Sequence, residues 1–421
     1  MQSPLPSSPI PAATPVHGTR ETHRRPTVSL LVGDLSAKGE GRWAGSRPFL
    51  LAQALQRAGY GVEILGFTDD HHIATIQSPA PVCAVAIPSF HWRWRAVGEL
   101  LTRMRGDLIY AHKLKPSSFG IALLHRLRHR RPVVVDIDDW ELSWHGGDDW
   151  HYRPSPRQLA RDLLKPQGAL HEMNHPFYLR QMENLVSYAD RITTHNAFLQ
   201  QRFGGTYVAN GKDVDAFDPS RYDPEDSRRR YGLADYRVIM FPGAPRPYKG
   251  VEDLLQAVAT LNQPDLRVVI VGGSPYDDYD QQLQQRWGQW LISLPQTPST
   301  DMPAVLAAAH VVAVPQRHHP AALAQFPLKL TDGMAMAKPV LATRVGDMPQ
   351  ILADTGYLTE PDNPADLATQ LAAIFADWPQ AQAQGQRARE RCQQHYSLAA
   401  MATQLDQLLT ELINPPPPSH P

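Results

Sequence analysis

The sequence has few cysteines, no long apolar run and almost no net charge, and each shortage excludes a class of protein. Only Cys83 and Cys392 are present, which excludes a disulfide framework and a cysteine-rich zinc site. The formal net charge is −1, so no overall field attracts the chain to nucleic acid. No stretch reaches the roughly 18 apolar residues of a membrane span, and the N-terminus lacks the apolar segment of a signal peptide. We therefore expect a cytoplasmic protein that can touch a membrane without crossing it.

Both ends of the chain are also poor in structure-forming residues. Residues 1–26 are rich in Pro, Ser and Thr, and the chain closes with NPPPPSHP. Such segments bury too little apolar area to offset the entropy that is lost on ordering. We predict disordered tails over 1–26 and 413–421.

What the chain does have is a series of short runs rich in valine and isoleucine. They lie at 28–33, 62–67, 82–87, 107–112, 133–138, 191–195 and 206–210, and again at 237–243, 267–273, 310–316 and 339–343. Runs of this length, bounded by turn residues, are typical of strands buried on both faces. Amphipathic helical patterns separate several of them, most clearly at 49–59 and 251–261. The alternation predicts an α/β fold with parallel sheets.

A polar, turn-rich stretch at 210–232 divides these runs into two series. We therefore predict two tandem Rossmann-like domains that face each other across a cleft. Ligands of such domains bind at the carboxyl ends of the strands.

The segment FPGAPRPYKG (241–250) follows one predicted strand and precedes a helix. Gly243 allows a ligand to approach the backbone, and Arg246 and Lys249 suit a diphosphate next to the positive end of the helix. The alternative interpretation is a solvated basic loop.

The segment FPLKLTDGMAMAKPVLAT (326–343) opens another helix, with Pro327 in its first turn. Lys329 and Asp332 are three residues apart and share a face, while Leu330, Met334 and Ala337 form the core-facing stripe. A lysine near a helix N-terminus opposes the helix dipole, so a nearby anion would explain it. Asp332 could accept hydrogen bonds from a ribose diol. The alternative is a surface ion pair worth less than about 1 kcal/mol.

Together these segments carry a resemblance. Matching stretches occur in family order at 189–219, 241–261, 266–273, 326–352 and 385–409. Over roughly residues 27–412 the chain resembles the retaining glycosyltransferases of family 4, which have the GT-B fold. The resemblance implies transfer of a sugar from a nucleotide-sugar donor to an acceptor hydroxyl with retention of anomeric configuration. It implies no metal and no other cofactor.

The resemblance also assigns the domains. Residues 27–212 would form an N-terminal acceptor domain, and residues 213–394 a C-terminal nucleotide-sugar donor domain. Residues 395–412 would be a helix that returns to the N-terminal domain.

In the donor domain, Arg246 and Lys249 align with the family's basic pair, which holds the diphosphate and neutralises its charge during reaction. Gly243 lets the phosphate approach. Asp332 stands where the family has the second glutamate of an E-x7-E motif, which binds the ribose. The first glutamate is replaced by Ala324, which leaves the donor sugar undefined. The approach resembles a P-x-K-L branch of the family and would bind the donor through these residues: Phe326, Pro327, Leu328, Lys329 and Thr331.

In the acceptor domain, the resemblance places a glycine loop with Gly39, Gly41 and Gly45 over the reacting centre; the alternative is a flexible surface loop. His112 ends a predicted strand and would act at the donor sugar, or it is simply packed there. Asp136, Asp138 and Asp139 follow a predicted strand and look like a D-x-D metal motif. The basic pair makes a metal redundant, so we expect an acceptor-side or structural role for Asp138 and Asp139.

The stretch that contains Trp92, Arg93, Trp94 and Arg95 pairs aromatic with cationic residues. Such residues suit a membrane interface or an anionic acceptor, although an amphipathic helix with a solvated basic face would look the same. The expected partners are a nucleotide sugar and a glycan, lipid-linked or small-molecule acceptor, with no nucleic acid. Two alternatives stay open: a nucleotide-sugar epimerase of the same fold, and a non-catalytic sugar- or nucleotide-binding protein.

Overall fold

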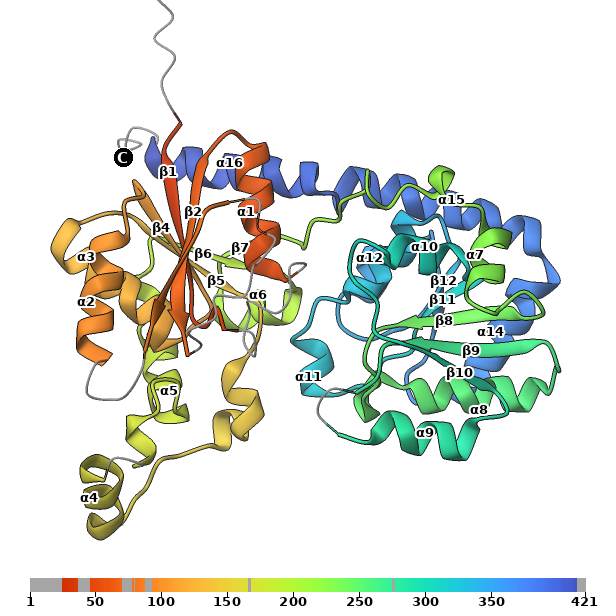
Figure 1. Cartoon of the computed structure of the whole chain (residues 1–421), viewed down its shortest axis with the longest axis horizontal. Helices are drawn as coiled ribbons and strands as arrows, with labels where there is room; N and C mark the ends of the chain where they lie inside the picture. Colours follow the sequence, from red (N-terminus) through yellow and green to blue (C-terminus); the bar gives the residue numbers. More distant parts are fainter. Residues whose placement is uncertain are drawn as a thin grey trace, which may run out of the picture.

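The computed structural model describes residues 25–36, 46–69, 78, 80–87, 93–165, 168–274 and 277–414. It contains two separate parallel sheets, each with helices against its faces (Figure 1). The first sheet has seven strands in the order β3-β2-β1-β4-β5-β6-β7, and the second has six in the order β10-β9-β8-β11-β12-β13. The predicted fold class, two tandem Rossmann-like domains, is confirmed.

The elements of the N-terminal domain alternate along the chain. Its strands and helices are β1 (Thr27–Val32), α1 (Arg47–Arg57), β2 (Gly61–Thr68), β3 (Val82–Ala86), α2 (Arg93–Arg103), β4 (Leu108–His112), α3 (Ile121–His129), β5 (Val133–Ile137), α4 (Pro156–Leu164), α5 (Pro176–Asn184), β6 (Arg191–Thr194), α6 (Ala197–Phe203) and β7 (Thr206–Tyr207).

The C-terminal domain repeats the alternation and adds two long helices. Its elements are α7 (Pro224–Arg230), β8 (Arg237–Pro242), α8 (Val251–Leu261), β9 (Leu266–Val271), α9 (Tyr279–Trp287), β10 (Leu291–Leu294), α10 (Met302–Ala307), β11 (Val311–Val314), α11 (Pro320–Leu323), α12 (Leu328–Ala335), β12 (Val340–Thr343), α13 (Met348–Leu352), β13 (Tyr357–Thr359), α14 (Pro364–Ala376), α15 (Trp378–His395) and α16 (Leu398–Ile413).

All eleven predicted apolar runs contain a strand of the structure. The run at 206–210 is the weakest, because only Thr206 and Tyr207 pair with β6. The sequence did not reveal β10 and β13, which are four and three residues long and lie at the two edges of their sheet. Strands this short and only partly buried do not form an apolar run.

The two predicted tails lie mostly outside the described residues. Two corrections concern their inner ends. Arg25 is part of the described structure and forms an ion pair with Asp406 of α16. At the other end, α16 continues to Ile413, one residue into the predicted tail.

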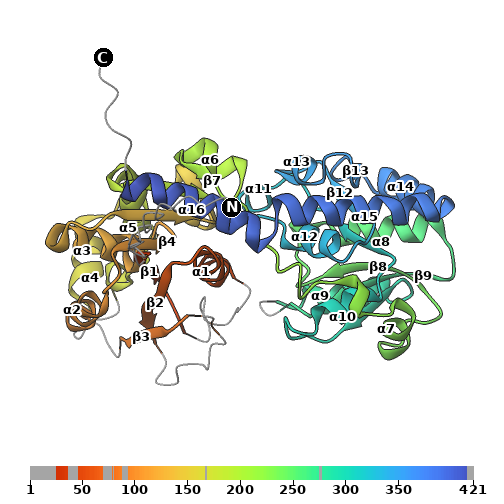
Figure 2. The ribbon, with the colours of Figure 1, turned by 90° about the horizontal axis from the view of Figure 1, so that it is seen from above.

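The last two helices tie the domains together. α15 and α16 run end to end along one side of the molecule, α15 over the C-terminal domain and α16 over the N-terminal one (Figures 1 and 2). Leu405 and Leu409 of α16 are fully buried in the same core cluster as Leu51 and Leu55 of α1. The N-terminal core is therefore completed by the end of the chain.

Contacts near the carboxyl ends of the strands also join the two domains. The backbone N–H of Phe326 donates to His195 Nε2 at 3.0 Å, and the N–H of Ala197 donates to the Asp347 carboxylate at 2.9 Å. The residues after β6 are thus fixed against the segments that begin α12 and α13. Among the described residues, the longest helices are too polar or too short to pass through a bilayer.

The place of Leu405 in the N-terminal core gives a testable expectation. Leu405→Ala removes a fully buried side chain and should lower the free energy of unfolding by about 2–5 kcal/mol, measured by urea denaturation. Gln404→Ala, on the exposed side of the same helix turn, is the matched control. Equal stabilities for the two variants would show that α16 contributes nothing to that core.

Candidate functional site

Three cations converge at the carboxyl end of β8. Gly243 follows the strand with a φ of 122°, a conformation that favours glycine. A Cβ atom built on Gly243 would lie 3.2 Å from Lys329 Cε and 3.4 Å from its Nζ. Lys249 closes the short turn η9 (Pro247–Lys249) and donates to the Ala244 carbonyl at 3.0 Å. Arg246 precedes this turn, so the predicted basic pair stands beside a third cation, Lys329.

Burial and neighbouring charges affect the ionisation of the two lysines in this cluster. Burial, together with the nearby charges of Lys329 and Arg246, lowers the pKa of Lys249 to about 6. Burial also lowers the pKa of Lys329. Cations held together in this way disfavour their own charged forms, and an anion placed among them would reverse that effect. Two lysines with lowered pKa values and an arginine therefore lie together at the end of β8.

The start of α12 corrects two details of the sequence prediction. Pro327 lies just before the first helical residue, not in the first turn, and Leu328 begins the helix. Leu330 and Met334 face the core as predicted, but Ala337 lies beyond the helix end with a φ of 53°. Phe326 and Thr331 are buried, and the Thr331 hydroxyl donates to the Leu328 carbonyl at 3.0 Å. Both residues therefore pack beneath the surface of the chain at the start of α12.

Lys329 and Asp332 turn to different neighbours. Lys329 points to the end of β8, whereas Asp332 forms an ion pair with Lys212 of the segment that joins the two domains. The Lys212 ammonium also lies 3.3 Å from the ring centroid of Phe217. The position of the family's first glutamate is Ala324, which is fully buried at the end of α11. Lys212 was not found from the sequence.

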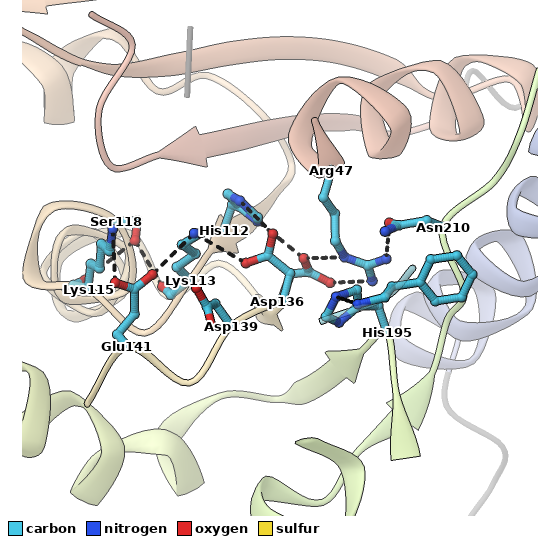
Figure 3. Close-up of polar contacts among 12 residues, drawn as sticks. Arg47, His112, Lys113, Lys115, Ser118, Asp136, Asp139, Glu141, His195 and Asn210 are labelled. Atoms are coloured by element: carbon cyan, nitrogen blue, oxygen red, sulfur yellow. Dashed lines mark hydrogen bonds and ion pairs between the residues drawn. The ribbon is translucent and has the colours of Figure 1, made fainter. Parts of the chain in front are cut away.

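The N-terminal domain contributes a buried polar network at the carboxyl edge of its sheet (Figure 3). Arg47, at the start of α1, forms a bidentate ion pair with Asp136 of β5, with both N–O distances 2.7 Å. The same guanidinium donates to the Val208 carbonyl at 3.0 Å and to Asn210 Oδ1 at 2.8 Å. Burial opposes ionisation of Asp136, but Arg47 and His112 outweigh it and hold the pKa of Asp136 far below its usual range.

His112 lies between two carboxylates. Its Nδ1 is 3.2 Å from Asp136 Oδ2, and its Nε2 is 3.5 Å from Asp138 Oδ2. The next residue, Lys113, has a φ of 71°, a strained conformation of the kind that gathers at functional sites. Lys113 lies 3.6 Å from Asp138 and 3.2 Å from Glu141. The end of β4 thus presents an imidazole framed by fixed charges.

Lys115 and Asp139 also lie at this edge of the sheet, which we call the acidic edge for its four carboxylates: Asp136, Asp138, Asp139 and Glu141. Lys115 Nζ lies 3.2 Å from Glu141 Oε2. Burial, with the charges of Glu141 and Asp138, raises the pKa of Asp139 to about 6. The indole N–H of Trp144 donates to Asp139 at 3.1 Å. These side chains can hold hydroxyl groups, since carboxylates accept and lysines donate hydrogen bonds.

Several predicted residues lie outside the described structure: Gly39, Gly41, Gly45 and Trp92. Within the described ranges, no three His, Cys, Asp or Glu side chains gather as a metal site would require. Sequence reasoning missed Arg47, Lys113, Lys115, Glu141 and Lys212. Arg47 had a usable signal, because a cation in the first turn of a helix opposes the dipole unless an anion faces it.

Comparison with known proteins gives the family. The chain is 32% identical over 424 residues to a protein named D-inositol 3-phosphate glycosyltransferase of Corynebacterium efficiens, covering 91% of this chain and 94% of that one. A model of the family "Glycosyl transferases group 1" matches residues 236–377. The chain belongs to the group 1 glycosyltransferases.

Other similarities agree with this assignment. The chain is 27% identical over 392 residues to a GDP-mannose-dependent alpha-(1-6)-phosphatidylinositol monomannoside mannosyltransferase of Mycolicibacterium smegmatis, with 88% of each covered. The structure of Anabaena HepE in complex with UDP and glucose superposes with a TM-score of 0.68 at 20% identity, covering 92% of this chain and all of HepE. That likeness shows the fold. The predictions of a GT-B fold and of an enzyme of the glycosyltransferase class are confirmed.

The buried ion pair of this glycosyltransferase gives a second prediction. Asp136→Asn leaves Arg47 buried without its counter-charge and should lower the free energy of unfolding by about 3–5 kcal/mol, measured by urea denaturation at pH 7.

The matched control is Asp139→Asn, which changes a carboxyl whose pKa is raised by burial to about 6, so that the fold does not stabilise its ionised form. Its effect should stay below about 1 kcal/mol, because the neutral amide replaces a charge that burial already disfavours at pH 7. If Asp136→Asn were as stable as this control, the ion pair would not hold the edge of the sheet together.

Proposed function

We propose that this glycosyltransferase moves a sugar from a nucleotide-sugar donor to an acceptor hydroxyl, with retention at the anomeric carbon and without a metal. The observation that carries the proposal is the convergence of Arg246, Lys249 and Lys329 beside Gly243. A donor diphosphate would add negative charge among these three side chains and so stabilise their charged forms. That the similarly folded HepE was crystallised with UDP and glucose supports a nucleotide donor.

In this proposal the donor lies across the start of α12. The diphosphate contacts Gly243 and the three cations, and the ribose diol donates hydrogen bonds to Asp332. The N-termini of α8 and α12 add the positive ends of their dipoles. Phe326, Pro327, Leu328 and Thr331 shape the donor pocket. With Ala324 in place of a glutamate, recognition of the sugar falls to other groups.

The chemistry proceeds on one face of the sugar. The bond between the anomeric carbon and the diphosphate oxygen breaks while the acceptor oxygen bonds to that carbon. The acceptor proton passes to the departing diphosphate oxygen. Arg246 and Lys249 neutralise the charge that grows on the diphosphate, so the protein contributes position and electrostatic stabilisation. His112, fixed between Asp136 and Asp138, contacts the donor sugar.

The acceptor lies on the N-terminal side, near Asp138, Asp139 and Glu141. The acceptor is a glycan, a lipid-linked molecule or a small polyol. The names of two relatives mention inositol 3-phosphate and a phosphatidylinositol mannoside, which supports a hydroxyl-rich acceptor. The proposal places the enzyme in the cytoplasm, with Trp94 and Arg95 exposed for peripheral contact with the membrane.

Turnover tests the donor assignment. Sugar conjugates of UDP, GDP and ADP are screened by thermal shift, and the one that stabilises the chain is used as donor. Arg246→Ala and Lys249→Ala should each lower kcat about 10²–10³-fold, because each removes charge stabilisation of about 2.7–4 kcal/mol from the transition state. Arg230→Ala, on the exposed face of α7, is the control.

Two results would contradict this proposal. Unchanged turnover in both cation variants at saturating donor would show that the diphosphate does not bind at the cluster. Conversion of the donor without any acceptor would identify an epimerase instead.

The low pKa of Lys249 predicts a pH dependence of donor binding. The free protein holds Lys249 largely neutral above pH 6, and the bound diphosphate raises the pKa of Lys249 and draws a proton onto it. Affinity for a nucleotide sugar, whose diphosphate does not titrate in this range, should therefore fall by up to about tenfold per unit between pH 6 and 8. Isothermal titration calorimetry would measure the affinity and the proton uptake together.

Lys249→Arg keeps a positive charge throughout this range, so its donor affinity should not change with pH. The same pH dependence in wild type and in this variant would assign the titration to another group.

A further inference from the structure

A large apolar groove lies on the N-terminal domain, apart from the candidate site. Its volume is about 1110 Å³, and it is lined by residues from α2, α3, α5 and the excursion between β5 and β6 that contains α4. Figure 1 shows α4 at the tip of this excursion, away from the sheet, with α5 between α4 and the sheet. The side chains that matter here are Trp94, Leu124, Leu127, Leu163 and Tyr188.

The groove and its surroundings contain large apolar side chains that are exposed to water. Among the described residues, the four most exposed large apolar side chains are Leu127, Leu164, Trp94 and Tyr188, which are 83%, 80%, 79% and 62% exposed. Three of them line the groove, and Leu164 ends α4 next to the lining residue Leu163. A contiguous apolar surface of this kind marks a place of interaction with a membrane or a protein.

The rim of the groove is positively charged. α3 ends with Arg126 and Arg128 and is followed by Arg130 and Arg131. α4 carries Arg157 and Arg161, opposite to Leu159 and Leu163 on the helix surface.

Two of these arginines pair with acidic groups. Arg126 pairs with Asp190, and Arg161 pairs with Asp162, which also accepts a hydrogen bond from the Tyr152 hydroxyl at 2.9 Å. Arg128, Arg130, Arg131 and Arg157 form no ion pair with another described residue, so the rim keeps a local excess of positive charge in a chain whose net charge is −1.

We propose that this face docks on a bilayer of anionic phospholipids. Leucine and tryptophan side chains enter the interface while the arginines contact lipid phosphates, which is how amphipathic helices lie on membranes. A second copy of the chain fits less well, because a symmetric dimer would bring the two arginine-rich rims face to face.

The position of the groove connects it with the candidate acceptor side. Pro116 and Gly120 line the groove and belong to the turn η3 (Pro116–Gly120), which follows directly on Lys115. Lys115 pairs with Glu141 at the acidic edge. A bilayer docked on the groove would therefore lie beside the end of β4, where a lipid-borne acceptor could reach the site; this last step rests on the proposed function.

Sedimentation with vesicles tests the proposal on the full chain without any substrate. Vesicles of phosphatidylcholine alone are compared with vesicles that also contain about 30% of the anionic lipid phosphatidylglycerol. The two kinds of vesicle differ in surface charge. Wild type should bind the anionic vesicles and release them at high salt. Arg128→Glu with Arg157→Glu should weaken binding at least about 25-fold, since each arginine near such a surface contributes about fivefold.

The apolar contribution is tested by Leu127→Ser with Leu164→Ser. Both side chains are exposed, so the fold should not suffer, and binding should weaken by about tenfold or more. The matched controls lie on the C-terminal domain and on α16: Arg230→Glu with Arg387→Glu, and Ile413→Ser. These should bind as wild type does.

Three results would overturn the proposal: no binding of wild type to anionic vesicles, equal binding to neutral ones, or equal losses in the control variants. A change of oligomeric state in the groove variants, seen by light scattering, with vesicle binding intact would assign the face to a second copy. Thermal shift with the donor separates this proposal from the proposed function. The groove variants should keep the thermal shift with the donor. If the chain bound vesicles but showed no shift with any donor, the docking proposal would hold and the proposed function would be contradicted.

Discussion

The buried ion pair between Arg47 and Asp136 organises the reactive edge of the N-terminal domain. Its two charges are shielded from water, so each depends on the other. Through Arg47 the pair connects the start of α1 to Val208 and Asn210 of the segment that leads into the second domain. Through Asp136 it orients His112. The position of the imidazole is thus fixed by a contact between elements far apart in the chain.

Both domains place a cation at the start of a helix, against the dipole, but they balance it differently. In α1, Arg47 finds its counter-charge within the chain, at Asp136. In α12, Lys329 lies beside Gly243 and shares its surroundings with Lys249 and Arg246. The first cation therefore stabilises the folded chain, whereas the second belongs to a cluster of cations that receives the donor diphosphate in the proposed function. The lowered pKa of Lys249 is the physical sign of that difference.

The sequence was sufficient for features that are local in the chain. Runs of valine and isoleucine located eleven strands, whereas β10 and β13 were too short and too exposed at the edges to form such runs. Arg246 and Lys249 could be paired because they stand only three positions apart, across one turn. Lys212 and Asp332 could not, since they lie 120 residues apart and only the return of the chain brings them together. The contact of Lys115 with Glu141 was hidden for the same reason.

In the proposed donor complex, the ion pair of Lys212 and Asp332 would bring the linker next to the ribose. Asp332 has two carboxylate oxygens with about four acceptor positions, so an ion pair with Lys212 still leaves room for two ribose hydroxyls. A carboxylate can only accept hydrogen bonds, which suits the two hydroxyl donors of a diol. Lys212 lies in the segment that joins the domains, and its backbone N–H donates to the Tyr396 carbonyl at 2.7 Å, just before α16. A ribose bound at Asp332 would therefore contact the same junction that sets how the two domains are joined.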